Sequence, residues 1–280
     1  MISVIITTKN NELILRGLLE SVKKQTYEKI EIIVVDNNSV DKTKQIASEY
    51  TKKVFNKGPE RSVQRNFGVE KAIGKYVVIL DSDMRLSKEV LENCKQIVQR
   101  DRVKALVIPE KTVGDNFIAK VRRFEREMYE GDSEIEVARF FERKVFLEFG
   151  GYDTKLTGPE DYDLPYRISK KYMIGRADKY LYHDESDLNL GKLLGKKFYY
   201  AKNGARYAQK HPELVRSQGN LLFRKVYLRH WKKFIKNPVL GLSFIFVRVL
   251  ETIFAIFGFI SAVGMIKFVR VLYKSIKVKK

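Results

Sequence analysis

The sequence predicts an α/β fold in which a mostly parallel sheet is flanked by helices, followed by a C-terminal helical segment. Three observations support this prediction. Short β-branched apolar runs alternate with helical patterns over the first 110 residues. Polar clusters directly follow three of these runs, and a long apolar stretch with basic flanks lies within residues 221–280.

Five short apolar runs in this region have the composition of strands buried on both faces of a sheet. They are residues 3–7, 30–35, 53–55, 76–80 and 105–108. Apolar residues at helical spacing predict helices at 12–22, 41–50, 62–72 and 91–100, the first of them capped by Asn10 or Asn11. Strands that alternate with helices imply a parallel sheet with right-handed crossovers.

Polar residues follow three of the strands, at 7–10, 36–39 and 81–83. Parallel sheets bind ligands beyond the carboxyl ends of their strands. A single aspartate at a strand end is often only a turn former or a helix cap, but three clusters at one edge favour a binding site. The sequence contains neither GxGxxG nor GxxxxGK[ST], so it lacks the usual dinucleotide and P-loop motifs.

The cluster after the fourth strand suggests a metal ion. Asp81 and Asp83 are separated by one residue, so both can place oxygen atoms near one hard cation. Mg²⁺ or Mn²⁺ binds through one or two carboxylates together with substrate phosphates. The cluster is therefore suited to neutralising a diphosphate leaving group.

Several segments in this order resemble the family 2 glycosyltransferases, which have the GT-A fold. They are SVIITTKNN, IEIIVVDNNSVDKT, RSVQRNFGVEKAIGKYVVILDSDM, FLEFGGYDTKL and GPEDYDLPYRI. The order and spacing match over about residues 1–190, and the combination is far more specific than the DxD motif alone. The resemblance implies a metal-dependent enzyme that transfers sugar from a nucleoside-diphosphate sugar.

The resemblance assigns the nucleotide side of the site to residues at the ends of the first two strands. Thr8 and Asn10 are expected to lie along the nucleotide. Asp36 is expected to contact the base or the ribose, with Ser39 nearby. The opening loop reads TTKN, where the family commonly has a proline and an aromatic residue, so this part of the site departs from the family pattern.

The sugar and diphosphate side follows from the next motifs. Arg65 and Asn66, in QRNFG, are expected to help hold the nucleotide-sugar. Asp83 is the expected principal metal ligand, and Asp81 is expected to contact the ribose or the sugar. His183 matches a histidine that some GT-A enzymes place near the metal or the diphosphate, although a hydrogen-bonded surface histidine explains it equally well.

The ED pair supplies the expected catalytic group. Asp161 is expected to be the base that takes the proton from the acceptor in an inverting displacement, and Glu160 is expected to orient it or contact the sugar. If the acceptor is a phosphate, no strong base is needed and Asp161 only positions groups. No QxxRW motif follows the pair, which favours transfer of a single sugar over processive synthesis.

Composition and charge limit the class of protein. The chain has 54 Lys or Arg against 34 Asp or Glu, a net charge of +20, so an anionic partner is expected. Its 44% hydrophobic content and single cysteine exclude a disordered chain and a disulfide-stapled one. A non-catalytic nucleotide-sugar or membrane-surface binding module is the alternative to the enzyme, and a nucleic-acid partner is not expected.

The C-terminal segment indicates which anionic partner is meant. Residues 221–280 carry 13 Lys or Arg and one acidic residue, Glu251, around an apolar stretch at 239–266 that Arg248 also interrupts. Basic flanks around an apolar run favour an anionic membrane surface over a nucleic-acid groove. A tilted span, a re-entrant hairpin near Gly258 and helices in the interface all fit this pattern, and a soluble core helix fits it less well.

The predicted organisation is a GT-A domain at 1–218 followed by a membrane-association segment at 219–280. Within the domain, residues 1–110 form the nucleotide-sugar half and 111–218 the acceptor half. The N-terminal residues lack a basic, apolar targeting segment, so the domain is expected to face the cytoplasm at the cell membrane. The membrane segment suggests a polyprenyl-phosphate or lipid-linked glycan acceptor.

Overall fold

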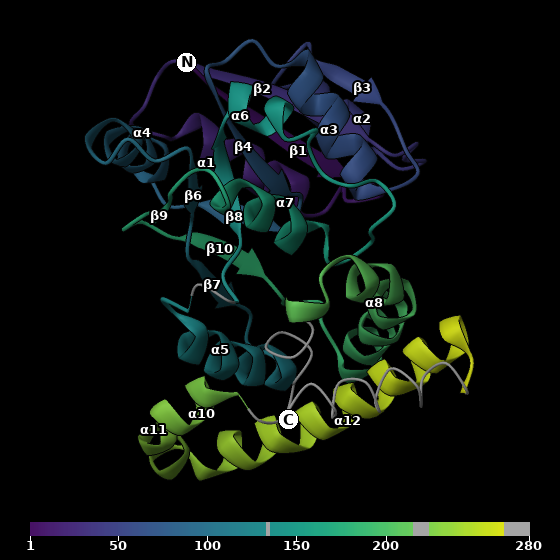
Figure 1. Ribbon diagram of the computed structural model, residues 1–280. Coiled ribbons are helices and arrows are strands. Elements are labelled where there is room, and N and C mark those ends of the chain that lie inside the picture. The colour runs from purple at the N-terminus through teal and green to yellow at the C-terminus, as the bar shows by residue number, and fades with distance from the viewer. Residues whose placement is uncertain (133–134, 215–223, 266–280) are drawn as a thin grey trace. The chain divides into compact units, whose positions relative to one another are not determined.

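The structure is a computed structural model that describes residues 1–132, 135–214 and 224–265 (Figure 1). The chain forms two compact units. Unit 1 contains Met1–Val113, Glu136–Thr154 and Glu160–Glu185, and unit 2 contains Gly114–Ile135, Lys155–Pro159 and Ser186–Lys280. The predicted domain boundary at residue 218 and the basic flank at 267–280 lie outside the described residues, so both stay predictions.

Unit 1 is built on a seven-stranded sheet with the order β3-β2-β1-β4-β8-β6-β9. Its strands are β1 (Ile2–Thr8), β2 (Ile30–Asp36), β3 (Val54–Asn56), β4 (Tyr76–Asp81), β6 (Ala105–Val107), β8 (Ala138–Glu142) and β9 (Ile174–Arg176). The sheet is mostly parallel, as predicted, but β8 runs antiparallel to both β4 and β6. The five predicted strands are all present in this sheet.

Helices cover both faces of the sheet because its central strands are apolar on both sides. In β1, Val4 and Ile6 belong to one core cluster and Ile5 to the other. The helices of unit 1 are α1 (Leu15–Lys23), α2 (Thr43–Ser48), α3 (Arg61–Lys71), α4 (Val90–Arg100), α6 (Arg143–Glu148) and α7 (Glu160–Ser169). The sheet with its helices is the predicted α/β architecture.

A second, three-stranded sheet was not predicted. It has the order β5-β10-β7 and contains β5 (Met84–Leu86), β10 (Leu181–Asp184) and β7 (Glu110–Val113). In it, β10 pairs antiparallel with β5, opposing His183 to Met84, and parallel with β7. This pairing brings β10 next to two strands that lie about 100 and about 70 positions earlier in the chain.

Unit 2 is helical among its described residues. It contains α5 (Phe117–Tyr129), α8 (Leu190–Lys210), α10 (Lys225–Arg229), α11 (Trp231–Lys236) and α12 (Pro238–Val263). Its core cluster joins Phe124, Leu193 and Phe244 from three of these helices. Among the described residues, α12 is the one helix long and apolar enough to cross a membrane. It runs unbroken through Gly258, where a hairpin turn was considered from the sequence.

Candidate active site

The ends of β1, β2 and β4 bring the polar clusters to one edge of the large sheet. Thr7 opposes Asp81 and Thr8 opposes Asp36 in the strand register. The Thr7 hydroxyl donates to Asp81 Oδ1 over 3.2 Å. The parallel order of the strands therefore produces the shared edge that the sequence pattern predicted.

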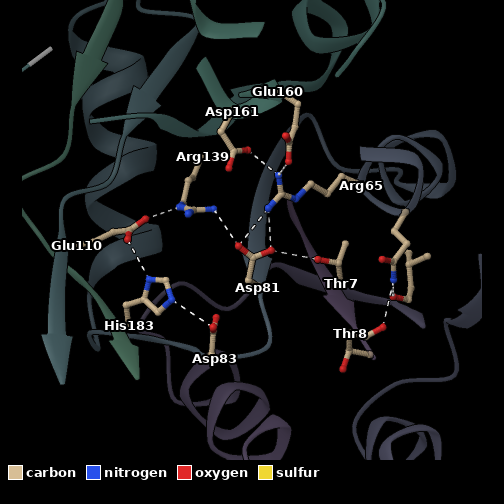
Figure 2. A network of polar contacts seen from close by, with 12 residues as sticks. Thr7, Thr8, Arg65, Asp81, Asp83, Glu110, Arg139, Glu160, Asp161 and His183 are labelled. Atoms are coloured by element: carbon tan, nitrogen blue, oxygen red, sulfur yellow. Dashed lines mark hydrogen bonds and ion pairs between the residues drawn. The ribbon is translucent and has the colours of Figure 1, made fainter. Parts of the chain in front are cut away.

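Arg65 is the centre of the site (Figure 2). It points from α3 toward this edge, and its side chain is fully buried. Its Nη2 donates to Asp81 over 2.8 Å, and its Nη1 donates to Asp161 over 2.6 Å and to Glu160 over 3.3 Å. One guanidinium thus joins the carboxylate that ends β4 to the pair that begins α7.

The chain of ion pairs continues on the other side of Asp81 (Figure 2). Arg139 of β8 lies 3.7 Å from Asp81 and donates from Nε to Glu110 over 2.7 Å. Glu110 contacts His183 Nδ1 at 3.2 Å, and His183 Nε2 lies 3.2 Å from Asp83. The predicted base and the predicted metal ligand are therefore the two ends of one continuous network.

The sequence reasoning missed Arg139 and Glu110. Both charged side chains are largely buried: that of Arg139 is 8% exposed and that of Glu110 is 18% exposed. Glu110 begins β7, and Arg139 lies on the antiparallel strand β8. A basic residue within the apolar run ARFFE was the only local signal that could have identified Arg139.

Asp83 and His183 have the chemistry of a divalent-cation site. The pairing of β5 with β10 places them together, and Asp83 Oδ1 is buried with no hydrogen-bond partner among the described residues. Glu110 engages the other ring nitrogen of His183, as outer-shell carboxylates do for metal-binding histidines. No group of three His, Cys, Asp or Glu suited to a metal occurs in the described chain, and magnesium or manganese sites in proteins often use only one or two carboxylates.

Burial and charge act on the carboxylates of the site in opposite directions. Burial alone would raise the pKa of Asp81, but Arg65, Arg61 and Arg139 outweigh it and hold this pKa well below its usual range. For Glu160, burial and the neighbouring Asp161 raise the pKa above its usual value. The site therefore keeps Asp81 ionised and favours the protonated form of Glu160 more than an exposed glutamate would.

The residues predicted on the nucleotide side form a turn beside this network. Asp36 is fully buried, and both of its carboxylate oxygens accept hydrogen bonds from Ser39. The Asn10 backbone N–H donates to the Ser39 hydroxyl over 2.7 Å, and the Asn10 side chain accepts from Val40 N–H over 3.0 Å. The predicted cap is wrong: α1 begins at Leu15 without a side-chain cap, because Asn10 is engaged in this turn.

Two further predicted residues have different environments. The Thr8 hydroxyl is buried with no hydrogen-bond partner in the described chain. Asn66 instead holds the GGYD loop: its amide donates to the Tyr152 carbonyl over 2.8 Å and accepts from the Tyr152 N–H over 2.9 Å. Gly151 has φ 67°, and a Cβ there would lie 2.6 Å from Asn66 Oδ1, so this close approach requires glycine.

A GT-A type of glycosyltransferase fold is defined by this sheet and the cluster at its edge. The family model described as "Glycosyl transferase family 2" matches residues 3–153, more than half of the chain. The chain belongs to glycosyl transferase family 2.

Curated relatives match a smaller part of the chain. Poly(ribitol-phosphate) beta-N-acetylglucosaminyltransferase TarS of Staphylococcus aureus is 34% identical over 122 residues, which are 40% of this chain and 21% of TarS. A GalNAc(5)-diNAcBac-PP-undecaprenol beta-1,3-glucosyltransferase of Campylobacter jejuni is 30% identical over 105 residues, 34% of this chain and 33% of that enzyme. The matched regions therefore span a third or less of these relatives.

Solved structures share the fold over most of the chain. The crystal structure of TarS 1–349 from S. aureus superimposes with a TM-score of 0.56 at 18% identity and covers 94% of this chain and 92% of that one. The mannosyltransferase PcManGT from Pyrobaculum calidifontis, in complex with GDP-Man and Mn²⁺, gives a TM-score of 0.58 at 18% identity and covers 99% and 79%. At such identities the likeness establishes the fold alone.

Proposed function

We propose that the protein is a metal-dependent, inverting glycosyltransferase that transfers a single sugar from a nucleoside-diphosphate sugar. The observation that carries the proposal is the network from Asp161 through Arg65 and Asp81 to His183 and Asp83. It fixes the positions of Asp161, the proposed proton acceptor, and of Asp83 and His183, the proposed cation ligands, around one strand edge. TarS, of the same fold, has been crystallised with UDP-GlcNAc, which supports a nucleotide-sugar donor.

The proposed donor site follows the positions of the residues. Thr8, Asn10, Asp36 and Ser39 hold the nucleotide at the ends of β1 and β2. Arg65, Asn66 and Asp81 hold the nucleotide-sugar, directly or through the loop that Asn66 fixes. Asp83 and His183 hold Mn²⁺ or Mg²⁺, which when bound neutralises charge on the departing diphosphate. The Mn²⁺ in the PcManGT complex supports this cofactor.

The proposed reaction is one in-line displacement. The acceptor oxygen forms a bond to the anomeric carbon while the bond from that carbon to the diphosphate oxygen breaks, which inverts the configuration. Asp161 accepts the acceptor's proton, and Arg65 holds the carboxylate in place through its 2.6 Å hydrogen bond. Glu160 shares the same guanidinium and so limits the positions that Asp161 can take.

The proposed acceptor is carried at a membrane surface, and a polyprenyl-phosphate or a lipid-linked glycan fits this role. One observation on this chain supports it: α12 has the length and composition of a membrane helix. The name of the C. jejuni relative includes an undecaprenol-linked substrate, which is consistent with the proposal. We place the protein at the cell membrane with its catalytic unit facing the cytoplasm.

Release of nucleoside diphosphate from a panel of intact donors, with Mn²⁺ or Mg²⁺ and a lipid extract, tests the proposal. Metal-dependent release by the native protein and its loss in Asp83→Ala, with an unchanged circular dichroism spectrum, are expected. Asp101→Ala, at an exposed position on the end of α4, is the matched control and should retain release. Undiminished turnover by Asp83→Ala would remove Asp83 from the metal site. Donor binding without release in the native protein would instead indicate a binding module.

A further inference from the structure

Helix α12 has the reverse of the usual amphipathic arrangement. Two glycines and two charged residues are among its buried positions. These positions are Gly241, Phe244, Val247, Arg248, Glu251 and Gly258. Its exposed face is apolar, and we call it the outer stripe: Leu242, Ile245, Phe246, Val249, Ile253 and Phe257. Helices that border water place charged residues outward and apolar residues inward. The outer stripe therefore has the composition of a surface that meets an apolar environment.

Buried ion pairs fix which face of α12 points inward. Arg248 Nη2 lies 2.9 Å from Glu125 of α5, and Arg248 also pairs with Glu251 one turn along α12. Glu251, fully buried, lies 3.7 Å from Lys197 of α8. Turning the helix over would leave these charges unpaired in an apolar setting, which is strongly unfavourable. The outer stripe is thus held outward by the pairs on the opposite face.

The packing of α12 against α8 argues against a transmembrane position. The two backbones approach closely, since a Cβ on Gly258 would lie 2.3 Å from the Phe198 carbonyl oxygen. The exposed basic residues of α8 are Lys192, Lys196, Lys202, Arg206 and Lys210. A spanning α12 would carry this helix into the hydrocarbon core, where Lys and Arg are highly unfavourable. A helix parallel to the bilayer surface leaves them in water.

We propose that α12 lies in the plane of an anionic bilayer, with the outer stripe inserted among the lipids and α8 outside the hydrocarbon. This inference rests on the membrane association proposed above and specifies its geometry. Trp231 is 54% exposed beside exposed Lys232 and Lys236, just before the outer stripe. Trp and Lys are typical of bilayer interfaces, whereas Lys is depleted from the cores of protein–protein interfaces. The bilayer is therefore a better occupant than a second protein.

Depth measurements on labelled protein test the geometry. A fluorophore is placed on the exposed face in Leu242→Cys, Val249→Cys and Ile256→Cys, and Cys94 is fully buried and stays unlabelled in the folded protein. Vesicles of phosphatidylcholine and phosphatidylglycerol carry bromine at shallow or deep acyl positions. An in-plane helix gives the same shallow quenching at all three sites. A spanning helix would place position 249 about 10 Å deeper than the other two and would overturn the proposal.

Substitutions in the outer stripe test the binding itself. Phe246→Asp and Phe257→Asp should each lower the partition coefficient into these vesicles by at least about tenfold, since each removes a large apolar side chain that the bilayer would bury. Leu13→Asp, at a position 92% exposed in unit 1, is the matched control and should partition normally. The inference would be refuted if the native protein did not bind the vesicles. It would also be refuted if the native protein were a dimer through the outer stripe and Phe246→Asp made it a monomer.

Diphosphate release measured without lipid separates this result from the proposed activity. Phe246→Asp should leave that release unchanged, because the residue belongs to unit 2 and the donor network to unit 1. Shallow, uniform quenching in a protein that releases no diphosphate would support the membrane geometry and refute the enzyme. Donor turnover by a protein whose labels stay unquenched would support the enzyme and refute the membrane geometry.

Discussion

Both units bury a network of ion pairs, but the two networks differ in their access to solvent. In unit 1, the side chains of Asp83, Asp161 and Asp81 are 31%, 18% and 15% exposed. In unit 2, Arg248 is 3% and Glu251 is 0% exposed. The same type of interaction is therefore open at the edge of the sheet and closed between the helices of unit 2.

This difference in solvent exposure suits the two networks to different roles: ligand binding at the sheet edge and helix packing in unit 2. An accessible carboxylate that is held by buried arginines can exchange a partner for a ligand, which is typical of functional sites. A closed network cannot accept a ligand without separating the helices, so its effect is to fix the position and orientation of α12 against α5 and α8. Arg65 and Arg248 thus have similar partners, but the partners of Arg65 include carboxylates that are partly open to solvent.

The largest difference should appear in turnover. Asp161→Asn removes the proposed proton acceptor and should lower the rate of sugar transfer by about 10²–10⁴-fold. Glu251→Gln makes the same type of change in the closed network and should alter turnover of the folded protein by less than about twofold. Steady-state kinetics on both variants checks this, and a comparable loss in Glu251→Gln would break the distinction between the two networks.

The next largest effect concerns the stability of unit 2. Arg248→Met should lower the free energy of unfolding by about 3–5 kcal/mol, because it removes a buried cation from two buried carboxylates, those of Glu125 and Glu251. The matched change Arg16→Met breaks a pair with Glu49 in which both side chains are more than 40% exposed, and should cost less than about 1 kcal/mol. Urea unfolding measures both, and equal losses would show that the network of unit 2 is not closed.

A smaller effect is expected on metal binding. Glu110→Gln weakens the contact that orients His183 and should lower Mn²⁺ affinity by about 10–100-fold without altering the fold. The change in affinity is read from the electron paramagnetic resonance signal of free Mn²⁺, independently of turnover. Glu148→Gln, on an exposed pair with Lys171, is the control. Identical Mn²⁺ titrations for the two variants would leave Glu110 with a structural role only.

The local hydrophobic pattern of the sequence was sufficient to predict the parallel strands of unit 1. The β-branched runs at β1, β2 and β4 are apolar on both faces, and their shared edge follows from parallel topology alone. The family resemblance assigned Arg65 to the nucleotide-sugar, and the structure shows its guanidinium in direct contact with Asp81 and Asp161. These features depend on short stretches of chain and on a topology that has few alternatives.

Long-range pairing explains what the sequence did not reveal. β8 enters the sheet between β4 and β6 from a later part of the chain, and only that insertion brings Arg139 to Asp81. Glu110 contacts His183 through the small sheet, across 73 positions of sequence. Glu110 has no local pattern that distinguishes it from a solvent-exposed charge, and Arg139 has only its position in the apolar run ARFFE. Single-sequence reasoning therefore identified the motif residues and missed those that connect them.

The smallest expected effect is a difference in sign between two pH profiles of stability. The pKa of Asp81 is lowered in the folded protein by Arg65, so its contribution is present above the ordinary carboxyl range near pH 4 and is lost as the pH falls. The pKa of Glu160 is raised by burial, so its contribution is present below that range and is lost as the pH rises.

Asp81→Asn should therefore be most destabilising at pH 7 and less so at pH 4. Glu160→Gln should become more stable relative to the native protein as the pH rises from 4 to 7. Each slope is at most about 1.4 kcal/mol per pH unit. Glu125→Gln in the closed network should follow Asp81→Asn, because Arg122 and Arg248 outweigh burial and lower the pKa of Glu125. Urea unfolding at pH 4, 5.5 and 7 measures the three slopes. Parallel slopes for Asp81→Asn and Glu160→Gln would contradict this prediction. They would mean that the pKa values of Asp81 and Glu160, which both contact Arg65, are shifted in the same direction.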